Sequence, residues 1–140
     1  MIKRSKKAKA RNRVIAQLDA LCRAAIMERD NNTCQRCGSH ENLQWSHVHS
    51  RRHYSIRWDT DNSKALCMGC HCWWTNHPTE ASYWFSRKWA DRWERIGELL
   101  RTSKPMKDVD LRQLLEEQTA AYPPGKMLKP DAWTDKDLPF

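Results

Sequence analysis

The sequence predicts a small α+β domain in which helices flank a short two-stranded hairpin. Two cysteine pairs of the form C-x-x-C enclose a segment whose residues alternate as in a β-strand. On both sides of these pairs, apolar residues recur at helical spacing. The chain has 140 residues, 39% of them hydrophobic, so it has room for one domain with a modest core.

The first helix is expected over residues 14–29. Its apolar positions follow helical spacing: Val14, Leu18, Leu21 and Ala25. A polar turn at 30–33 ends it. Cys22 lies on the apolar side without a partner at ligand spacing, so we expect it in the core. Residues 1–13 hold seven Lys or Arg and no acidic residue, so they form either a flexible basic arm or the frayed start of this helix.

The hairpin follows the first cysteine pair. Residues 43–48 alternate as a strand, and residues 63–67 can form a short return strand. The polar residues 49–61 between them are predicted to be a loop. A helix should begin near Cys70 and carry His71 in its first turn.

Beyond Pro78 the sequence predicts a longer helix and then a short one. One stripe of the longer helix carries side chains that we expect in the core rather than on a base-stacking platform: Phe85, Trp89, Trp93, Ile96 and Leu100. Pro105 breaks this helix. Asp108 is expected to cap the short helix, which should run to Gln118. The Pro-containing remainder is expected to be poorly structured.

The net charge of +8 is concentrated in one part of the chain. Residues 1–60 carry 13 Lys or Arg against 5 Asp or Glu, whereas residues 61–140 carry 12 of each. Such an excess suggests a polyanionic partner, most commonly nucleic acid, with a solvated basic tail as the alternative. We expect a basic arm at 1–13, the main domain at 14–101, and a short helix with a Pro-containing tail at 102–140.

The cysteine spacing predicts a structural zinc site. No apolar run is long enough to span a bilayer and no signal peptide is evident, so we expect a cytoplasmic, reducing location in which paired cysteines are typical of metal ligands. The four expected ligands are Cys34, Cys37, Cys67 and Cys70. Two unrelated pairs of buried cysteines are the alternative. Cys72 is at the wrong spacing to join them.

The segment between and after these pairs resembles the HNH, or ββα-metal, endonucleases. His47, Asn62 and His71 fall in the order in which that family places a strand histidine, an asparagine and a histidine on the following helix. His71 directly follows the fourth cysteine, as in the subtype with two cysteine pairs. The lead-in to Cys34 and the stretch 50–59 are similar to phage recombination nucleases of the NinG type. The resemblance covers roughly residues 18–100 and implies a zinc-stapled ββα hairpin.

The expected chemistry is hydrolysis of a phosphodiester bond. His47 is the candidate general base, because an imidazole can deprotonate water near neutral pH. A backbone carbonyl or an Asn side chain can hold its ring in the useful orientation, and by resemblance Asn62 has that role. His71 is the best candidate ligand for a catalytic divalent ion, which would be Mg²⁺, Mn²⁺, Ni²⁺ or Zn²⁺.

The residue before the candidate base departs from the family pattern. Family members usually carry His or Asp there as a second metal ligand, whereas this chain has Ser46, and a hydroxyl is a poor ligand for such an ion. Another side chain then compensates, or water fills the position, or the ion binds weakly. The candidate substitutes are His53, His77 and His49.

Basic residues near the hairpin and in the arm are expected to contact DNA phosphates: Arg51, Arg52, Arg57, Lys6 and Lys7. We therefore expect a metal-dependent DNA endonuclease, and by resemblance one that acts in phage or mobile-element DNA processing. Its partners would be DNA and phage DNA-processing proteins in the bacterial host cytoplasm. The alternatives are a catalytically inactive zinc-dependent DNA-binding module and a structural zinc protein of a larger assembly.

Overall fold

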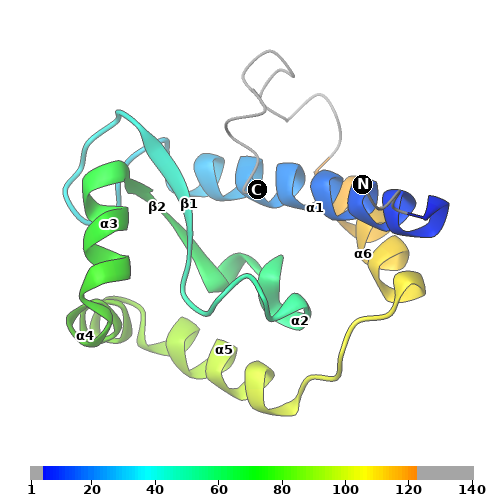
Figure 1. Cartoon of the computed structure of the whole chain (residues 1–140). Coiled ribbons are helices and arrows are strands. Elements are labelled where there is room, and N and C mark those ends of the chain that lie inside the picture. The colour runs from blue at the N-terminus through cyan, green and yellow to red at the C-terminus, as the bar shows by residue number, and fades with distance from the viewer. Residues whose placement is uncertain (1–4, 123–140) are drawn as a thin grey trace. The chain divides into compact units, whose positions relative to one another are not determined.

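The computed structural model describes residues 5–122 and has the expected α+β composition (Figure 1). In chain order the elements are α1 (Lys6–Arg29), β1 (Leu43–His47), α2 (Tyr54–Arg57), the 3₁₀ helix η1 (Thr60–Asn62), β2 (Ser63–Cys67), α3 (Met68–Asn76), α4 (Pro78–Lys88), α5 (Ala90–Thr102) and α6 (Asp108–Ala121). None of the described helices combines the length and apolar character that a bilayer span requires.

The chain divides into two compact units. One consists of residues 26–105 and contains the hairpin with α2 to α5. The other combines residues up to Ala25 with those from Met106 onward, so its described part pairs most of α1 with α6. This division differs from the predicted domain at 14–101, because the first helix groups with the last one.

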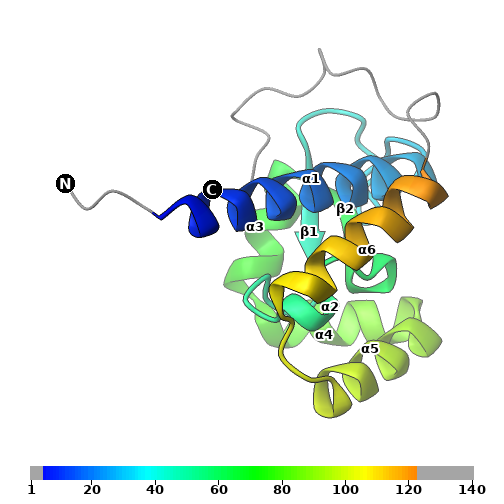
Figure 2. The same cartoon turned by 90° about the vertical axis from the view of Figure 1, so that its right-hand side faces the viewer.

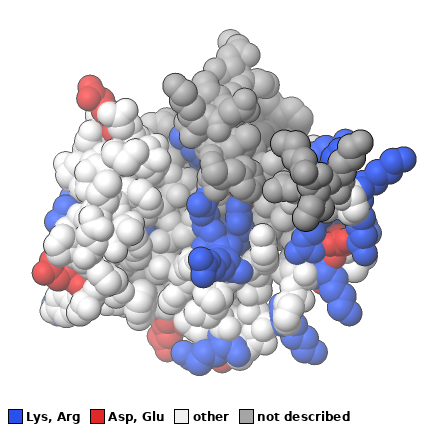
Figure 3. Space-filling model, viewed as in Figure 1, with Lys and Arg blue, Asp and Glu red and all other residues white. Residues whose placement is uncertain are grey.

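In the unit formed by α1 and α6, the two helices run side by side (Figures 1 and 2). Leu18 and Leu111 are buried, and Arg11 hydrogen-bonds to Asp108. Residues 6–13 belong to α1, which therefore begins before Val14. Figure 3 shows Lys and Arg side chains gathered around the first turns of α1, where the basic residues of the expected arm lie.

Helix α6 begins and ends differently from the prediction. Lys107 precedes its first turn, and the backbone N–H of Lys107 donates to the Asp110 carboxylate at 2.9 Å. Asp108 is therefore the first helical residue and not the cap. The helix continues to Ala121, three residues beyond the expected end. The predicted tail from residue 123 lies outside the described residues.

The two strands pair antiparallel, as the alternating pattern predicts. Leu43 lies opposite Cys67, Ser46 opposite Lys64, and His47 opposite Ser63. β2 has its predicted bounds, and β1 ends one residue earlier than expected. Because β2 leads directly into α3, the end of the hairpin and the start of the helix lie together.

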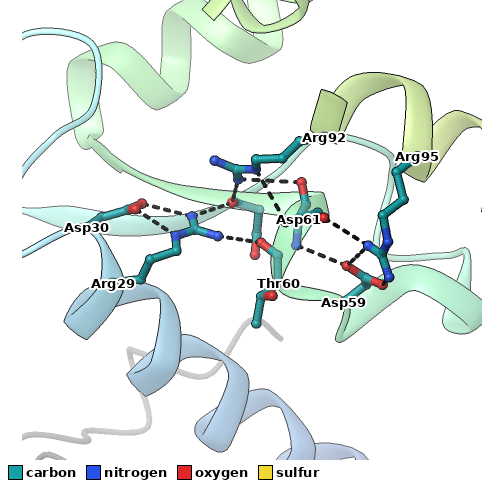
Figure 4. A network of polar contacts seen from close by, with 8 residues as sticks. Arg29, Asp30, Asp59, Thr60, Asp61, Arg92 and Arg95 are labelled. Carbon is teal, nitrogen blue, oxygen red and sulfur yellow. Dashed lines mark hydrogen bonds and ion pairs between the residues drawn. The ribbon is translucent and has the colours of Figure 1, made fainter. Parts of the chain in front are cut away.

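The predicted loop between the strands contains two short helices, α2 and η1. Asp59 precedes η1, and its carboxylate accepts a hydrogen bond from the Asp61 backbone N–H at 3.0 Å. Three arginines then hold this segment from outside (Figure 4). Arg29 donates to the carbonyl oxygens of Thr60 and Ser63, at 2.6 and 2.8 Å.

Two of these arginines come from α5. Arg92 donates to the Ser63 carbonyl at 2.7 Å, and Arg95 contacts both Asp59 and Asp61 at 2.8 to 2.9 Å (Figure 4). The pKa of Arg92 is lowered to about 10 by burial and by the neighbouring Arg29. The network fixes η1, and with it the residue that ends η1, Asn62.

The predicted long helix after Pro78 is wrong, because it is divided at Trp89 into α4 and α5. The backbone of Trp89 leaves the helical region, with φ −134° and ψ 66°. Its N–H still donates to the Phe85 carbonyl at 2.8 Å, so the apolar periodicity runs on across the break. Phe85 and Ile96 are fully buried, as the stripe predicts, while Trp93 is half-buried.

Candidate functional site

The four paired cysteines form one cluster. The sulfur atoms of Cys34, Cys37, Cys67 and Cys70 all lie within 4.8 Å of one another. The first pair lies in a turn in which Gly38 donates its N–H to the Cys34 carbonyl at 2.9 Å. Gly38 has φ +81°, a backbone conformation that glycine adopts without strain. The second pair spans the junction of β2 and α3, so hairpin pairing carries it across 29 intervening residues to the first.

Four sulfur donors at this separation fit a tetrahedral zinc ion. Such sites are closed, with all four positions taken by the protein. Neighbouring groups also hydrogen-bond to two of the sulfur atoms. The Cys70 N–H donates to the Cys67 sulfur at 3.5 Å, and Arg36 donates to the Cys70 sulfur at 3.6 Å while its guanidinium lies 3.7 Å from the centre of the Trp73 ring. Cys72 is exposed and outside the cluster.

His47 lies at the end of β1 with its ring fixed from one side. Its Nε2 is 3.0 Å from the backbone carbonyl of Arg57. A carbonyl only accepts, so Nε2 carries the proton and Nδ1 keeps its lone pair in the neutral ring. Burial lowers the pKa of His47 to about 3, and the charges of Arg51 and Arg57 act in the same direction. The ring is therefore neutral near pH 7, the state that a general base requires.

Asn62 acts on the loop rather than on the His47 ring. Its side chain is fully buried, accepts the His49 N–H at 2.9 Å and donates to the carbonyls of His49 and Ile56 at 3.3 and 3.1 Å. The structure thus corrects the role that the resemblance implies. The Arg57 carbonyl orients the ring, while Asn62 bonds to Ile56, which precedes Arg57, and to His49 just after β1.

His71 lies in the first turns of α3 and contacts Ser46. Its Nδ1 is 3.1 Å from the Ser46 hydroxyl oxygen. The amino group of Lys64 is 3.1 Å from the same oxygen, 3.2 Å from the His47 carbonyl, and 3.1 Å from the centre of the Trp74 ring. Lys64 is completely buried, and burial lowers its pKa well below the usual value. Burial lowers the pKa of His71 as well.

A second, catalytic metal ion does not fit this donor set. In residues 5–122, the four cysteines are the one group of three or more His, Cys, Asp or Glu side chains close enough to share an ion. Beside His71 stand a hydroxyl and a lysine amine, which are poor partners for a divalent ion. The expected substitutes do not join it. His53 and His77 are exposed residues at helix starts, and His49 packs against Trp93 with 5.7 Å between ring centres.

The expected phosphate-contacting residues differ in exposure. Lys6, Lys7 and Arg52 are exposed. Arg57 is instead buried at 6% exposure, where its guanidinium donates to the Arg51 carbonyl and lies 5.5 Å from the centres of two aromatic rings. Arg57 therefore lies inside the fold rather than at the surface. Its backbone carbonyl hydrogen-bonds to the candidate base, and its buried charge helps to lower the pKa of that base.

Sequence reasoning missed Lys64 altogether. A signal for it exists, since Lys64 is the one charged residue in the otherwise uncharged strand Ser63–Cys67. Strand register then places it opposite Ser46, the position at which the sequence departs from the pattern of the family that it resembles. The unusual lysine in β2 and the unusual serine in β1 are therefore partners in one contact between the two strands.

No protein-family model, no curated protein and no solved structure matches the chain significantly.

Proposed function

We propose that this chain is a DNA endonuclease of the HNH type that hydrolyses or nicks the phosphodiester backbone, with His47 as general base. The observation that carries the proposal is the His47 ring, which is neutral and held by the Arg57 carbonyl with Nδ1 free to accept a proton. His47 lies at the end of β1, which pairs with β2, the strand that ends at Cys67 of the cysteine cluster.

The proposed step is removal of a proton from water by His47 Nδ1. The resulting hydroxide attacks the scissile phosphorus, the bond to the leaving oxygen breaks, and that oxygen takes up a proton from the solvent. A pKa of about 3 makes the ring a weak base in the free protein. A nearby phosphate favours the protonated ring and raises that pKa, so DNA itself brings the base closer to its working range.

Binding of the polyanion is supported by basic side chains on both units. Lys6 and Lys7 are exposed on the first turn of α1, and Arg52 is exposed in the loop after β1. Lys7 lies 3.9 Å from Asp108, a weak surface pair with the lysine 87% exposed. These charges are free to meet phosphates and to bind DNA in a salt-dependent way.

The divalent ion expected from the resemblance has no ready place beside His71, so the steps above are assigned to protein groups alone. Mg²⁺ commonly keeps several waters and is held by substrate phosphates together with few protein groups. Nicking can therefore depend on an added ion that the chain alone does not hold tightly.

A second function is favoured by a specific observation. Ser46 occupies the sequence position at which the family that the chain resembles usually carries a second metal ligand, and Lys64 donates to its hydroxyl. This arrangement suits a zinc-stabilised DNA-binding module that has lost catalysis. The two functions differ in one measurable property, because only the nuclease cleaves DNA.

The test is plasmid nicking by the zinc-loaded full chain with Mg²⁺, Mn²⁺ or Ni²⁺, and without added ion. We expect nicking that falls by roughly 10²–10⁴-fold in His47→Ala, with DNA affinity unchanged. His40→Ala is the matched control, because His40 is exposed in the turn after the first cysteine pair. DNA binding without nicking under every condition would instead establish the non-catalytic module.

A further inference from the structure

We propose that Lys64, acting through Ser46, holds His71 as a hydrogen-bond donor to a DNA phosphate and not as a metal ligand. The identity of the ligand rests on the proposed function, whereas the state of His71 rests on contacts within residues 26–105. Lys64 and Ser46 are positioning residues here, and His71 is the group that meets the phosphate.

The first step concerns the donors of Lys64. A lysine amino group donates hydrogen bonds, and a backbone carbonyl can only accept them. One N–H therefore goes to the His47 carbonyl at 3.2 Å. Another goes to the Ser46 oxygen at 3.1 Å, and the Trp74 ring face takes the remaining side of the group, 3.1 Å from the ring centre. These contacts account for all three N–H groups of an ammonium, and two oxygen acceptors and a ring face favour that charged form against the burial that lowers its pKa.

The second step concerns the hydroxyl of Ser46. Ser46 is completely buried, so its hydrogen needs an acceptor inside the protein. The oxygen already accepts from Lys64, and the remaining contact is His71 Nδ1 at 3.1 Å. The hydroxyl therefore donates to Nδ1. The opposite direction would leave a buried hydroxyl hydrogen without a partner, at a cost of about 1–3 kcal/mol.

The third step concerns the other ring nitrogen of His71. A neutral imidazole carries one N–H, so a ring that accepts at Nδ1 carries its proton at Nε2. His71 then offers an N–H from a half-exposed position in the first turns of α3. A phosphate oxygen accepts such a bond. A divalent ion needs a lone pair, and neither nitrogen has one available.

The test is the tautomer of His71, read from two-bond nitrogen–proton NMR correlations of the zinc-loaded full chain labelled with ¹⁵N-histidine. We expect the Nε2–H form, and a shift of the Nε2 signal when a short DNA duplex is added. The Nδ1–H form in the free protein would overturn the proposal. Because the first reading needs neither DNA nor cleavage, it stands or falls separately from the proposed nuclease activity.

Variants separate the positioning role from a merely structural one. In Lys64→Met the Ser46 oxygen is free to accept, so we expect a loss of the fixed Nε2–H tautomer. Lys104→Met, at an exposed position, is the matched control and should keep it. An unchanged tautomer in folded Lys64→Met would overturn the role of Lys64. Should that variant fail to fold, Ser46→Ala can be used, because it removes the hydroxyl between Lys64 and His71. It should also abolish the preference of His71 for the Nε2–H tautomer.

Mn²⁺ provides the complementary measurement on the wild-type chain. Its paramagnetism broadens the signals of any ring that it binds. We expect the His71 signals to stay sharp when Mn²⁺ is added without DNA. Selective broadening of His71 would show that the ring is a metal ligand and would overturn the proposal.

Discussion

The cysteines and the histidines of this chain behave differently, although both look like metal ligands in the sequence. The four cysteines of the two pairs meet with their sulfur atoms within 4.8 Å. The histidines do not assemble into any comparable group within the described residues. His47 and His71 instead bind a backbone carbonyl and a serine hydroxyl.

The difference follows from how each set is encoded. A C-x-x-C pair brings two sulfur atoms together within one turn, so hairpin pairing needs to align only two such turns. Each histidine is placed singly by its own element. Its partners are therefore decided by tertiary contacts such as the Ser46–Lys64 pairing across the strands, which no local spacing reveals.

The largest expected effect comes from breaking the cysteine cluster. Cys67→Ser should lose zinc and unfold the hairpin unit, because structural zinc contributes about 10–16 kcal/mol in small domains, at least as much as a typical domain's net stability. Circular dichroism and zinc content by mass spectrometry measure this. Cys72→Ser, an exposed cysteine outside the cluster, should remain folded and loaded with zinc. A folded, zinc-free Cys67→Ser protein would show that the cluster is not a structural metal site.

A smaller effect is expected from His47, which is half-buried. The pKa of His47 is about 3 in the folded protein and about 6.5 in the unfolded chain, so the unfolded chain binds more protons between these values. The contribution of His47 to stability is complete above about pH 6.5 and is lost as the pH falls toward 3. From about pH 7 to about pH 5 the loss should be about 2 kcal/mol.

Urea unfolding of wild type and His47→Gln at several pH values measures this contribution. The variant should be less stable at neutral pH but should lose less on acidification. His40→Gln, which changes an exposed histidine in the turn after the first cysteine pair, is the control substitution. If the unfolding free energies of wild type and His47→Gln depend on pH in the same way, the folded protein does not hold the His47 ring in its neutral form.

The parts that the sequence predicted are those with strong local patterns. The cysteine pairs, the strand Ser63–Cys67 and the helix that ends at Arg29 were all predicted, because periodicity and fixed spacing act within a few residues. The break at Trp89 was not, since no Gly or Pro marks it and the apolar period continues across it.

The site was predicted less completely than the fold. His47 was placed on its strand, but its partner is a backbone carbonyl ten residues along the chain, and sequence patterns carry no information about such contacts. Lys64 was missed because a lysine in a strand is ordinarily exposed, whereas here an aromatic ring, a hydroxyl and a carbonyl enclose it. Only the strand register shows that Lys64 lies opposite Ser46, the residue that replaces the usual ligand.

The most direct test of the contrast between cysteines and histidines is the metal content of the full chain. Native mass spectrometry of the zinc-loaded protein, after exposure to excess Mn²⁺ and desalting, should show about one zinc ion per chain and no bound manganese. Cys37→Ser should lose the zinc, while His71→Ala should leave it in place. A second tightly bound metal that disappears in His71→Ala would show that the histidines also form a metal centre, and would contradict the account.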